Sequence, residues 1–248
     1  MLANLPFERN LLIDHRIDRL TTISITSLDL AALLCSRVCH DVISPVGAIV
    51  NGLEMLDSEA DEEMRTVAMD LIKKSAISAS ARLQFCRLAF GAAGSLGASI
   101  DTGDAENVAR GLITNDRTEL RWKGRRSLLR KNTVKLMLNL SLIAASAIPR
   151  GGVVDVEFDA EGEIVRLKVE AKGTNARLPH AAAVILAGGE AEAIDAHSIQ
   201  PYYTALLAKD CGMIVQSAAS SESVVLTARP EGLVSLAAQV GSVDVAFG

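Results

Sequence analysis

The stretch from Leu28 to Leu56 constrains the fold of this chain more than any other. Apolar residues recur there at steps of three or four positions. At about 100° per residue, such a row lies along one side of a helix. The stretch is therefore predicted to be one long amphipathic helix whose apolar side needs a partner. The row consists of Leu30, Leu34, Val38, Val42, Pro45, Ile49, Leu53 and Leu56.

The opposite side of this helix is polar and rich in small residues, with a histidine near its middle. A lone histidine on a helix surface usually has no special role, so its neighbours decide how it is interpreted. Leu33, Ile43 and Val50 border the polar side and leave apolar spots beside the ring. The polar side consists of Ser36, His40, Ser44, Gly47, Asn51 and Glu54.

The run from His40 to Val46 reads His-Asp-Val-Ile-Ser-Pro-Val. It resembles the phosphoacceptor motif of two-component sensor kinases: histidine, an acid, two variable residues, Thr, Ser or Asn, then proline and an apolar residue. Proline inside a helix removes a hydrogen bond and costs roughly 3 kcal/mol, so we expect a kink or loosened turn just past the histidine. The resemblance implies that His40 accepts a phosphoryl group.

A second helix is predicted to follow. Asp57-Ser58 ends the first, the acidic run 59–63 suits the positive end of the next, and an apolar pattern continues to Phe90. Glycines at 91, 94, 97 and 103 then indicate a flexible link. Two helices cannot fully bury two apolar faces against each other. We therefore expect residues 25–97 to dimerise as an antiparallel hairpin, giving a four-helix bundle in a homodimer.

The rest of the chain is of mixed α/β type. Strands are predicted at 118–123, 153–158, 164–171, 213–217 and 223–227, and helices at 104–114, 128–148, 178–186 and 198–211. The fold class is thus α+β, with a second domain at 104–230. Residues 1–24, a leader, and 231–248, a tail, stay unassigned.

This order of elements resembles the Bergerat-type ATP-binding domain of sensor kinases, an α/β sandwich. The run from Asn139 to Gly152 is similar to the helix of such kinases that ends in Pro-x-Gly-Gly. However, Ile143 stands where the family has the metal-holding Asn, and Ser146 stands where a Lys is usual. Of the adenine-binding Asp-x-Gly-x-Gly run only Gly173 remains. The domain is therefore expected to be degenerate and to bind no ATP, since phosphates need such groups.

A kinase-like chain with its histidine but without its nucleotide site is similar to the ChpT-type histidine phosphotransferases of alphaproteobacteria, which are dimeric relay proteins of cell-cycle control. The resemblance implies that His40 takes a phosphoryl group from an aspartyl phosphate of one receiver domain and donates it to a second. Asp41 would orient the ring, and Ser44, one turn on, would contact a phosphoryl oxygen or a water. The Mg²⁺ would belong to the receiver, so no cofactor or metal of the chain itself is expected.

Receiver domains are the expected partners: one of an upstream hybrid kinase and one of a downstream regulator. They should dock around His40, on Arg37, Ile43, Gly47, Val50 and Asn51. The basic run Lys123-Gly124-Arg125-Arg126, with Arg130-Lys131, is a further candidate contact, although such runs are more often solvated surface.

Composition and charge exclude several other classes. The net charge of −5 argues against general nucleic-acid binding. The four cysteines lack CxxC spacing, and although Cys35 and Cys39 lie one turn apart, no second pair completes a metal site. There is no signal peptide and no uninterrupted apolar run of about 18 residues, so a cytoplasmic protein without a membrane span is expected. His15, His180 and His197 lack catalytic neighbours and are interpreted as structural or surface residues.

Two alternatives stay open. The chain could be an active ATP-dependent sensor kinase with divergent nucleotide motifs, or a non-catalytic dimeric adaptor for receiver domains in which His40 has no chemical role.

Overall fold

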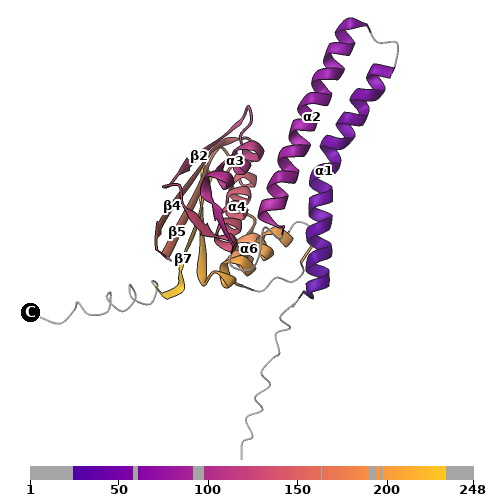
Figure 1. The fold of residues 1–248 in the computed structure, drawn as a ribbon. Helices are drawn as coiled ribbons and strands as arrows, with labels where there is room; N and C mark the ends of the chain where they lie inside the picture. Colours follow the sequence, from indigo (N-terminus) through magenta and orange to yellow (C-terminus); the bar gives the residue numbers. More distant parts are fainter. Residues whose placement is uncertain are drawn as a thin grey trace, which may run out of the picture.

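The computed structural model describes residues 25–57, 61–91, 98–162, 164–189, 194, 195 and 198–232. The leader at 1–24 and residues 233–248 of the tail lie outside these ranges, as do His15 and His197. The described chain consists of a protruding helical hairpin beside a sandwich of helices on one face of a sheet (Figure 1).

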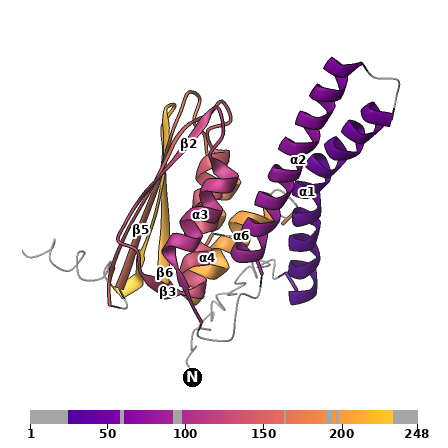
Figure 2. The same ribbon diagram turned by 45° about the horizontal axis from the view of Figure 1, so that its top comes forward.

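The hairpin is formed by α1 (Ser27–Asp57) and α2 (Glu62–Ala89), close to the predicted bounds. Thr26 caps α1, since its hydroxyl oxygen accepts from the Asp29 backbone N–H at 3.1 Å. Asp61 caps α2 by accepting from the Met64 N–H at 2.8 Å. α1 runs on through Pro45 and bends along its length (Figure 2), as expected for a proline inside a helix.

Close approach of the two helices depends on a small residue. Gly52 is buried on the α2 side of α1, and a Cβ added there would lie 2.6 Å from Ile72 Cγ1. Leu53, a member of the predicted apolar row, is about half exposed. Each step of four residues turns about 40° past a full turn, so the row drifts around the helix. Part of the row is therefore not covered by α2.

The five-stranded sheet has the order β2-β4-β5-β7-β6, in which β2 and β4 are parallel and the other neighbours are antiparallel. Its strands are β2 (Thr118–Lys123), β4 (Gly152–Glu161), β5 (Ile164–Lys172), β6 (Met213–Ala219) and β7 (Ser223–Pro230). The helices are α3 (Thr102–Ile113), α4 (Lys131–Ser146), α5 (His180–Leu186) and α6 (Ile199–Asp210). The α+β class and the predicted strand pairs are confirmed.

Two local predictions were wrong at the start of this domain. Residues 128–130 are not helical but form β3 (Leu128–Arg130), which pairs with the unpredicted β1 (Ser99–Asp101). Gly103, assigned to the link, lies in the first turn of α3 and donates its N–H to the Asp101 carboxylate at 2.7 Å. A strand of three residues is too short to show a period-two pattern in the sequence. Whether it forms depends on the segment with which it pairs.

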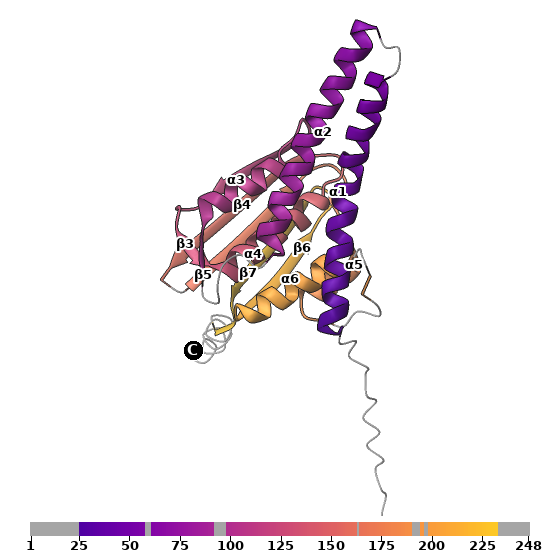
Figure 3. The same cartoon turned by 45° about the vertical axis from the view of Figure 1, so that its right-hand side comes forward.

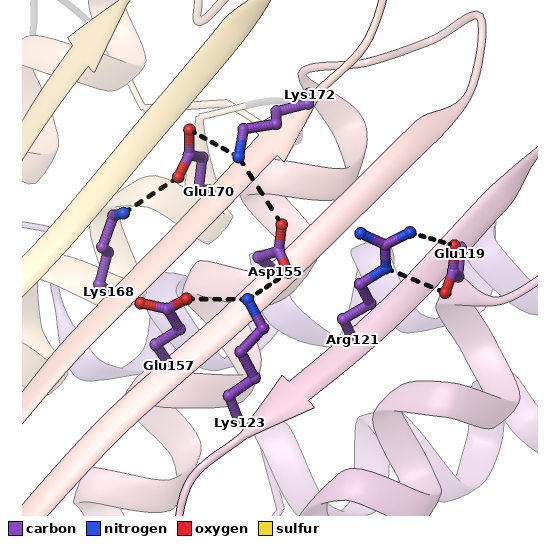
Figure 4. Close-up of polar contacts among 8 residues, drawn as sticks. All are labelled: Glu119, Arg121, Lys123, Asp155, Glu157, Lys168, Glu170 and Lys172. Atoms are coloured by element: carbon purple, nitrogen blue, oxygen red, sulfur yellow. Dashed lines mark hydrogen bonds and ion pairs between the residues drawn. The ribbon is translucent and has the colours of Figure 1, made fainter.

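The sheet buries one face under the helices and leaves the other charged. Along β5, Val165, Leu167, Val169 and Ala171 are all buried. The alternate positions meet oppositely charged residues across the strands, as Figure 4 shows around Asp155. Asp155 lies 3.0 Å from Lys123 Nζ and 3.9 Å from Lys172 Nζ. Because acidic and basic side chains pair with one another on this face, the outer surface of the sheet is polar without an excess of one charge.

The hairpin and the sandwich share one core. Phe85 and Ala89, near the end of α2, are fully buried in the cluster that includes α3, α4 and the sheet. Figures 1 and 3 both show this end of α2 against α4. The Asn139 side-chain amide, fully buried on α4, donates to the Ala89 carbonyl oxygen at 3.3 Å and to that of Lys135 at 2.9 Å. The buried amide thereby satisfies a carbonyl at the end of α2 that no helical N–H can reach.

Among the described helices, α1 alone is long and apolar enough to meet the length and composition criteria of a membrane span. These criteria are weak evidence for a single helix, because helices that pack inside proteins also meet them. One side of α1, with Pro45 and Gly52 buried, packs along α2, while other apolar residues of α1 stay exposed in the single chain.

Candidate functional site

The surface of α1 divides into three sides about 120° apart, identified here by Pro45, Val46 and His40. The Pro45 side contacts α2, and Pro45 itself is buried. The Val46 side is apolar and exposed. The His40 side is polar, and the His40 side chain is 87% exposed to solvent. An imidazole this accessible can be reached by a group on another protein.

Asp41 lies beside the ring but is bound to another residue. Its Oδ1 is 3.7 Å from His40 Nδ1, too far for a hydrogen bond. Its Oδ2 accepts from Arg37 Nε at 3.0 Å, one turn earlier on the same helix. In this arrangement Asp41 lies beside the ring and does not hold it through a hydrogen bond.

The Arg37–Asp41 pair is directed toward α2. Both charges act on the Cys86 thiol, whose pKa is raised to about 11, first by burial and then by Asp41, with Arg37 and Arg82 opposing. Arg37 was predicted to be a docking residue, but its side chain is only 21% exposed and its guanidinium is already paired. It contributes to the α1–α2 interface as well as to the surface near His40.

The remaining predicted site residues lie on the accessible surface around His40. Ser44 and Asn51 are exposed, and Ile43 is 68% exposed to solvent. Val50 is about half exposed, and a Cβ added to Gly47 would meet no atom within 4 Å. The helix thus brings a reactive ring, small residues and two apolar side chains to one surface.

The basic run at 123–126 is largely neutralised by the chain's own acids. Lys123 pairs with Asp155 and Glu157 at 3.0 Å each, and these contacts raise its pKa, the Asp155 contact most. Arg126 Nε donates to Asp101 at 2.8 Å and lowers the pKa of that carboxyl group. This supports the interpretation of the run as solvated surface.

The region that matches a kinase nucleotide site contains no group suited to a metal or a phosphate at the two altered positions. Ile143 is buried in the core. The Ser146 hydroxyl donates back to the Leu142 carbonyl at 2.9 Å. Among the described residues, no group of three or more His, Cys, Asp or Glu side chains is arranged to hold a metal ion.

Gly152, from the Pro-x-Gly-Gly run, and Gly173, from the Asp-x-Gly-x-Gly run, both pack closely against backbone atoms. A Cβ on Gly152 would lie 2.0 Å from the Lys172 carbonyl oxygen, and one on Gly173 would lie 2.3 Å from that of Gly151. The Arg177 N–H donates to the Ala147 carbonyl at 2.9 Å and ties the segment after β5 to the end of α4. In this chain the glycines allow close backbone contacts.

Sequence reasoning did not identify the role of Asn139, which was matched only to a kinase motif. In the structure its amide joins α4 to α2. A buried Asn in an otherwise apolar helix was the available signal, because such a side chain needs partners.

Comparison with known proteins agrees with this architecture. Residues 102–223 match the family model for the histidine phosphotransferase C-terminal domain. The chain is 52% identical over 208 residues to protein phosphotransferase ChpT of Brucella abortus (strain 2308), covering 83% of this chain and 98% of that protein. It is 49% identical to a solved bacterial phosphotransferase, with a TM-score of 0.77, covering 84% of this chain and 99% of that one. On this identity and coverage, the chain belongs to the ChpT-type histidine phosphotransferases.

Proposed function

We propose that the protein relays a phosphoryl group between aspartates of two receiver domains through a phosphohistidine at His40. The observation that supports this most directly is the 87% exposed imidazole in the middle of a polar helix side, flanked by small and apolar residues. Phosphoryl transfer depends mainly on positioning and charge neutralisation, and both could be completed by a docked receiver with its Mg²⁺.

In the first step, the lone pair of His40 Nε2 attacks the phosphorus of a receiver's aspartyl phosphate. The N–P bond forms as the P–O bond to the aspartate breaks, and the carboxylate leaves with the bonding electrons. The second step is the same displacement in reverse, with the carboxylate of another receiver as nucleophile. Protein groups therefore need to orient the ring and exclude competing water.

Asp41 is proposed to stabilise the positive charge that develops on the ring, because its Oδ1 lies 3.7 Å from Nδ1. The Arg37 guanidinium, bound to the other carboxylate oxygen, would hold Asp41 in position. Ser44, exposed one turn after His40, is proposed to contact a phosphoryl oxygen directly or through water.

We propose that ATP is not the phosphoryl source. Ile143, at the position of the metal-holding Asn, is buried, and the Ser146 hydroxyl is bonded to its own helix. The backbones of Gly151 and Gly173 also lie close together. The kinase alternative requires MgATP to bind where these groups lie.

Receivers are proposed to dock on Ile43, Gly47, Val50 and Asn51, where an apolar rim surrounds small residues that allow close approach. Ile43→Glu should weaken receiver binding at least tenfold without altering the circular dichroism spectrum. Leu128→Glu, at an equally exposed position on β3 and outside the hairpin, is the matched control. Loss of helical signal in the Ile43 variant would instead indicate that Ile43 is buried in the dimer.

We also propose a homodimer in which two hairpins form a four-helix bundle. Its interface would consist of the exposed apolar side chains on the Val46 side of α1 and on α2. A monomer would leave these large side chains in water, and burying each stabilises by roughly 1.5–3 kcal/mol. The exposed apolar side chains of the hairpin include Leu28, Val46, Val50, Leu53, Met64, Val67 and Ile77.

Light scattering on a sizing column tests the dimer. Val46→Glu should shift the protein toward the mass of a single chain, because it would bury an unpaired charge in the bundle. Asn51→Glu, on the His40 side of the same helix, should leave the mass unchanged. Equal masses for the Val46 variant and the unaltered protein would contradict the proposed interface.

The relay itself is tested by incubation with a phosphorylated receiver domain and detection of an acid-labile label on this chain. His40→Ala should abolish the label, whereas His180→Ala, at the exposed start of α5, should retain it. Labelling from MgATP in the absence of a receiver would favour the kinase alternative. Undiminished signalling by the His40 variant would favour the adaptor. A cytoplasmic location and a place in cell-cycle control are proposed from family membership.

A further inference from the structure

A cavity of about 1010 Å³, whose lining does not include the relay histidine, lies between the amino end of α4, the carboxyl end of α6 and the end of α2. Its walls include Phe90, Lys131, Thr133, Lys135, Tyr203 and Leu206. Lys135 and Ile143 are about two turns apart on α4, roughly 12 Å along its axis. The cavity is therefore distinct from the degenerate nucleotide region at the other end of that helix.

The cavity wall contains a buried cation without a counter-ion. Lys135 is only 6% exposed, and the bond that it makes is a long one, 3.4 Å from Nζ to the Tyr203 hydroxyl oxygen. Within the described ranges, no carboxylate forms an ion pair with it. Burial, and then the neighbouring Lys131, lower the pKa of the amine. A buried ammonium group is costly unless it is paired, so a negative charge in the cavity would satisfy it.

The same end of the cavity receives the amino terminus of α4. This helix begins at Lys131 and is not capped by a side-chain hydrogen bond from Arg130. The N–H groups of a first helical turn, together with the helix dipole, favour an anion. One acid also lines this wall: Asp210, whose Oδ2 accepts from Asn132 Nδ2 at 2.6 Å. This hydrogen bond orients the carboxylate but leaves its negative charge in place, so an anion would bind nearer to Lys131 and Lys135.

The remaining wall is apolar and aromatic. The Phe90 and Tyr203 rings meet edge to face, with centroids 5.7 Å apart, and Leu206 lies nearby on α6. The volume is far larger than a single inorganic anion needs. The wall therefore suits a ligand that has an organic body as well as an anionic group.

We propose that this cavity binds a small phosphate monoester, with its phosphate on Lys135 and the first turn of α4 and its body against Phe90 and Tyr203. A dianion matches the two lysines at this end, Lys131 and Lys135. The Tyr203 hydroxyl, which accepts from Lys135, has its own proton to donate to a phosphate oxygen. Since Phe90 ends α2, an occupant would contact the hairpin and the sandwich together.

Calorimetric titration of the full-length protein with phenyl phosphate tests the proposal. Phenyl phosphate should bind more tightly than inorganic phosphate, and phenol should bind at least tenfold more weakly. Lys135→Met, which keeps the length of the side chain but removes its charge, should weaken phenyl phosphate binding at least tenfold. Lys73→Met, at an exposed position on α2, and His40→Ala should leave the affinity unchanged, which separates this site from the relay histidine.

Amide NMR shifts of the unaltered protein decide the question even if the Lys135 variant fails to fold. Addition of phenyl phosphate should shift the Asn132 and Thr133 amides at the start of α4. No binding at millimolar phenyl phosphate, equal binding of phenol, or shifts confined to the surface around His40 would each overturn the proposal.

Discussion

Two glycines on α1 differ only in what lies beyond them, and this difference predicts opposite effects of the same substitution. Glycine in a helix interior costs about 1 kcal/mol relative to alanine. At Gly47 an added Cβ meets nothing within 4 Å, so replacing this glycine by alanine should give the full gain in folding stability. At Gly52 the Cβ would lie 2.6 Å from Ile72 Cγ1 and 3.2 Å from the Ala68 carbonyl oxygen.

Overpacking of this kind costs roughly 1–3 kcal/mol. We therefore expect Gly47→Ala to stabilise the protein by about 1 kcal/mol and Gly52→Ala to be neutral or to destabilise it by up to roughly 2 kcal/mol. For a chain of this size, 1 kcal/mol corresponds to a shift of about 2–4 °C in the melting temperature.

The assay is urea and thermal unfolding followed by circular dichroism, at equal protein concentration because the protein is proposed to be a dimer. The two variants carry the same chemical change on the same helix, so each serves as the control for the other. If Gly52→Ala stabilises the protein as much as Gly47→Ala, the close α1–α2 approach at that position is refuted.

Two further predictions concern titratable groups. The pKa of Glu170 is lowered, first by Lys168 and also by Lys172, so its contribution to stability exists above the ordinary glutamate pKa and is lost as pH falls through the lower folded value. Glu170→Gln should thus destabilise at pH 7 but match the unaltered protein in acid unfolding scans near pH 2. Buried Cys86, with its pKa raised to about 11, should resist iodoacetamide at pH 8 while exposed Cys39 reacts, as read by mass spectrometry; equal rates would contradict its burial.

Most of the element order could be predicted because helical and strand periods are local properties of the chain. The α1 row, the acid-capped start of α2 and the alternation in β4 and β5 each left a pattern in consecutive residues. The sequence did not predict β1 and β3. Each has three residues, and each residue pairs with one about 29 positions away along the chain. The apolar row did not indicate which of its members α2 would cover, because steps of four drift around the helix and leave Leu53 about half exposed.

The candidate site was predictable in its residues but not in their partners. The motif around His40 singled out the ring that is proposed to react, and the polar row predicted its exposure, which the structure shows. No pattern indicated that Arg37 would bind Asp41 on the side toward α2, because that choice depends on which flank of α1 the second helix covers.

By itself, the sequence determined two long amphipathic helices, a histidine on a polar side within a phosphoacceptor-like motif, and an α/β domain without the usual nucleotide-binding residues. These follow from local periodicity and residue chemistry. Only the tertiary structure decided that Asn139 ties α4 to the end of α2 and that Lys135 is buried in a cavity wall, where no described carboxylate forms an ion pair with it. Burial and pairing depend on residues that are distant along the chain, and their cost or gain exists only once those residues meet.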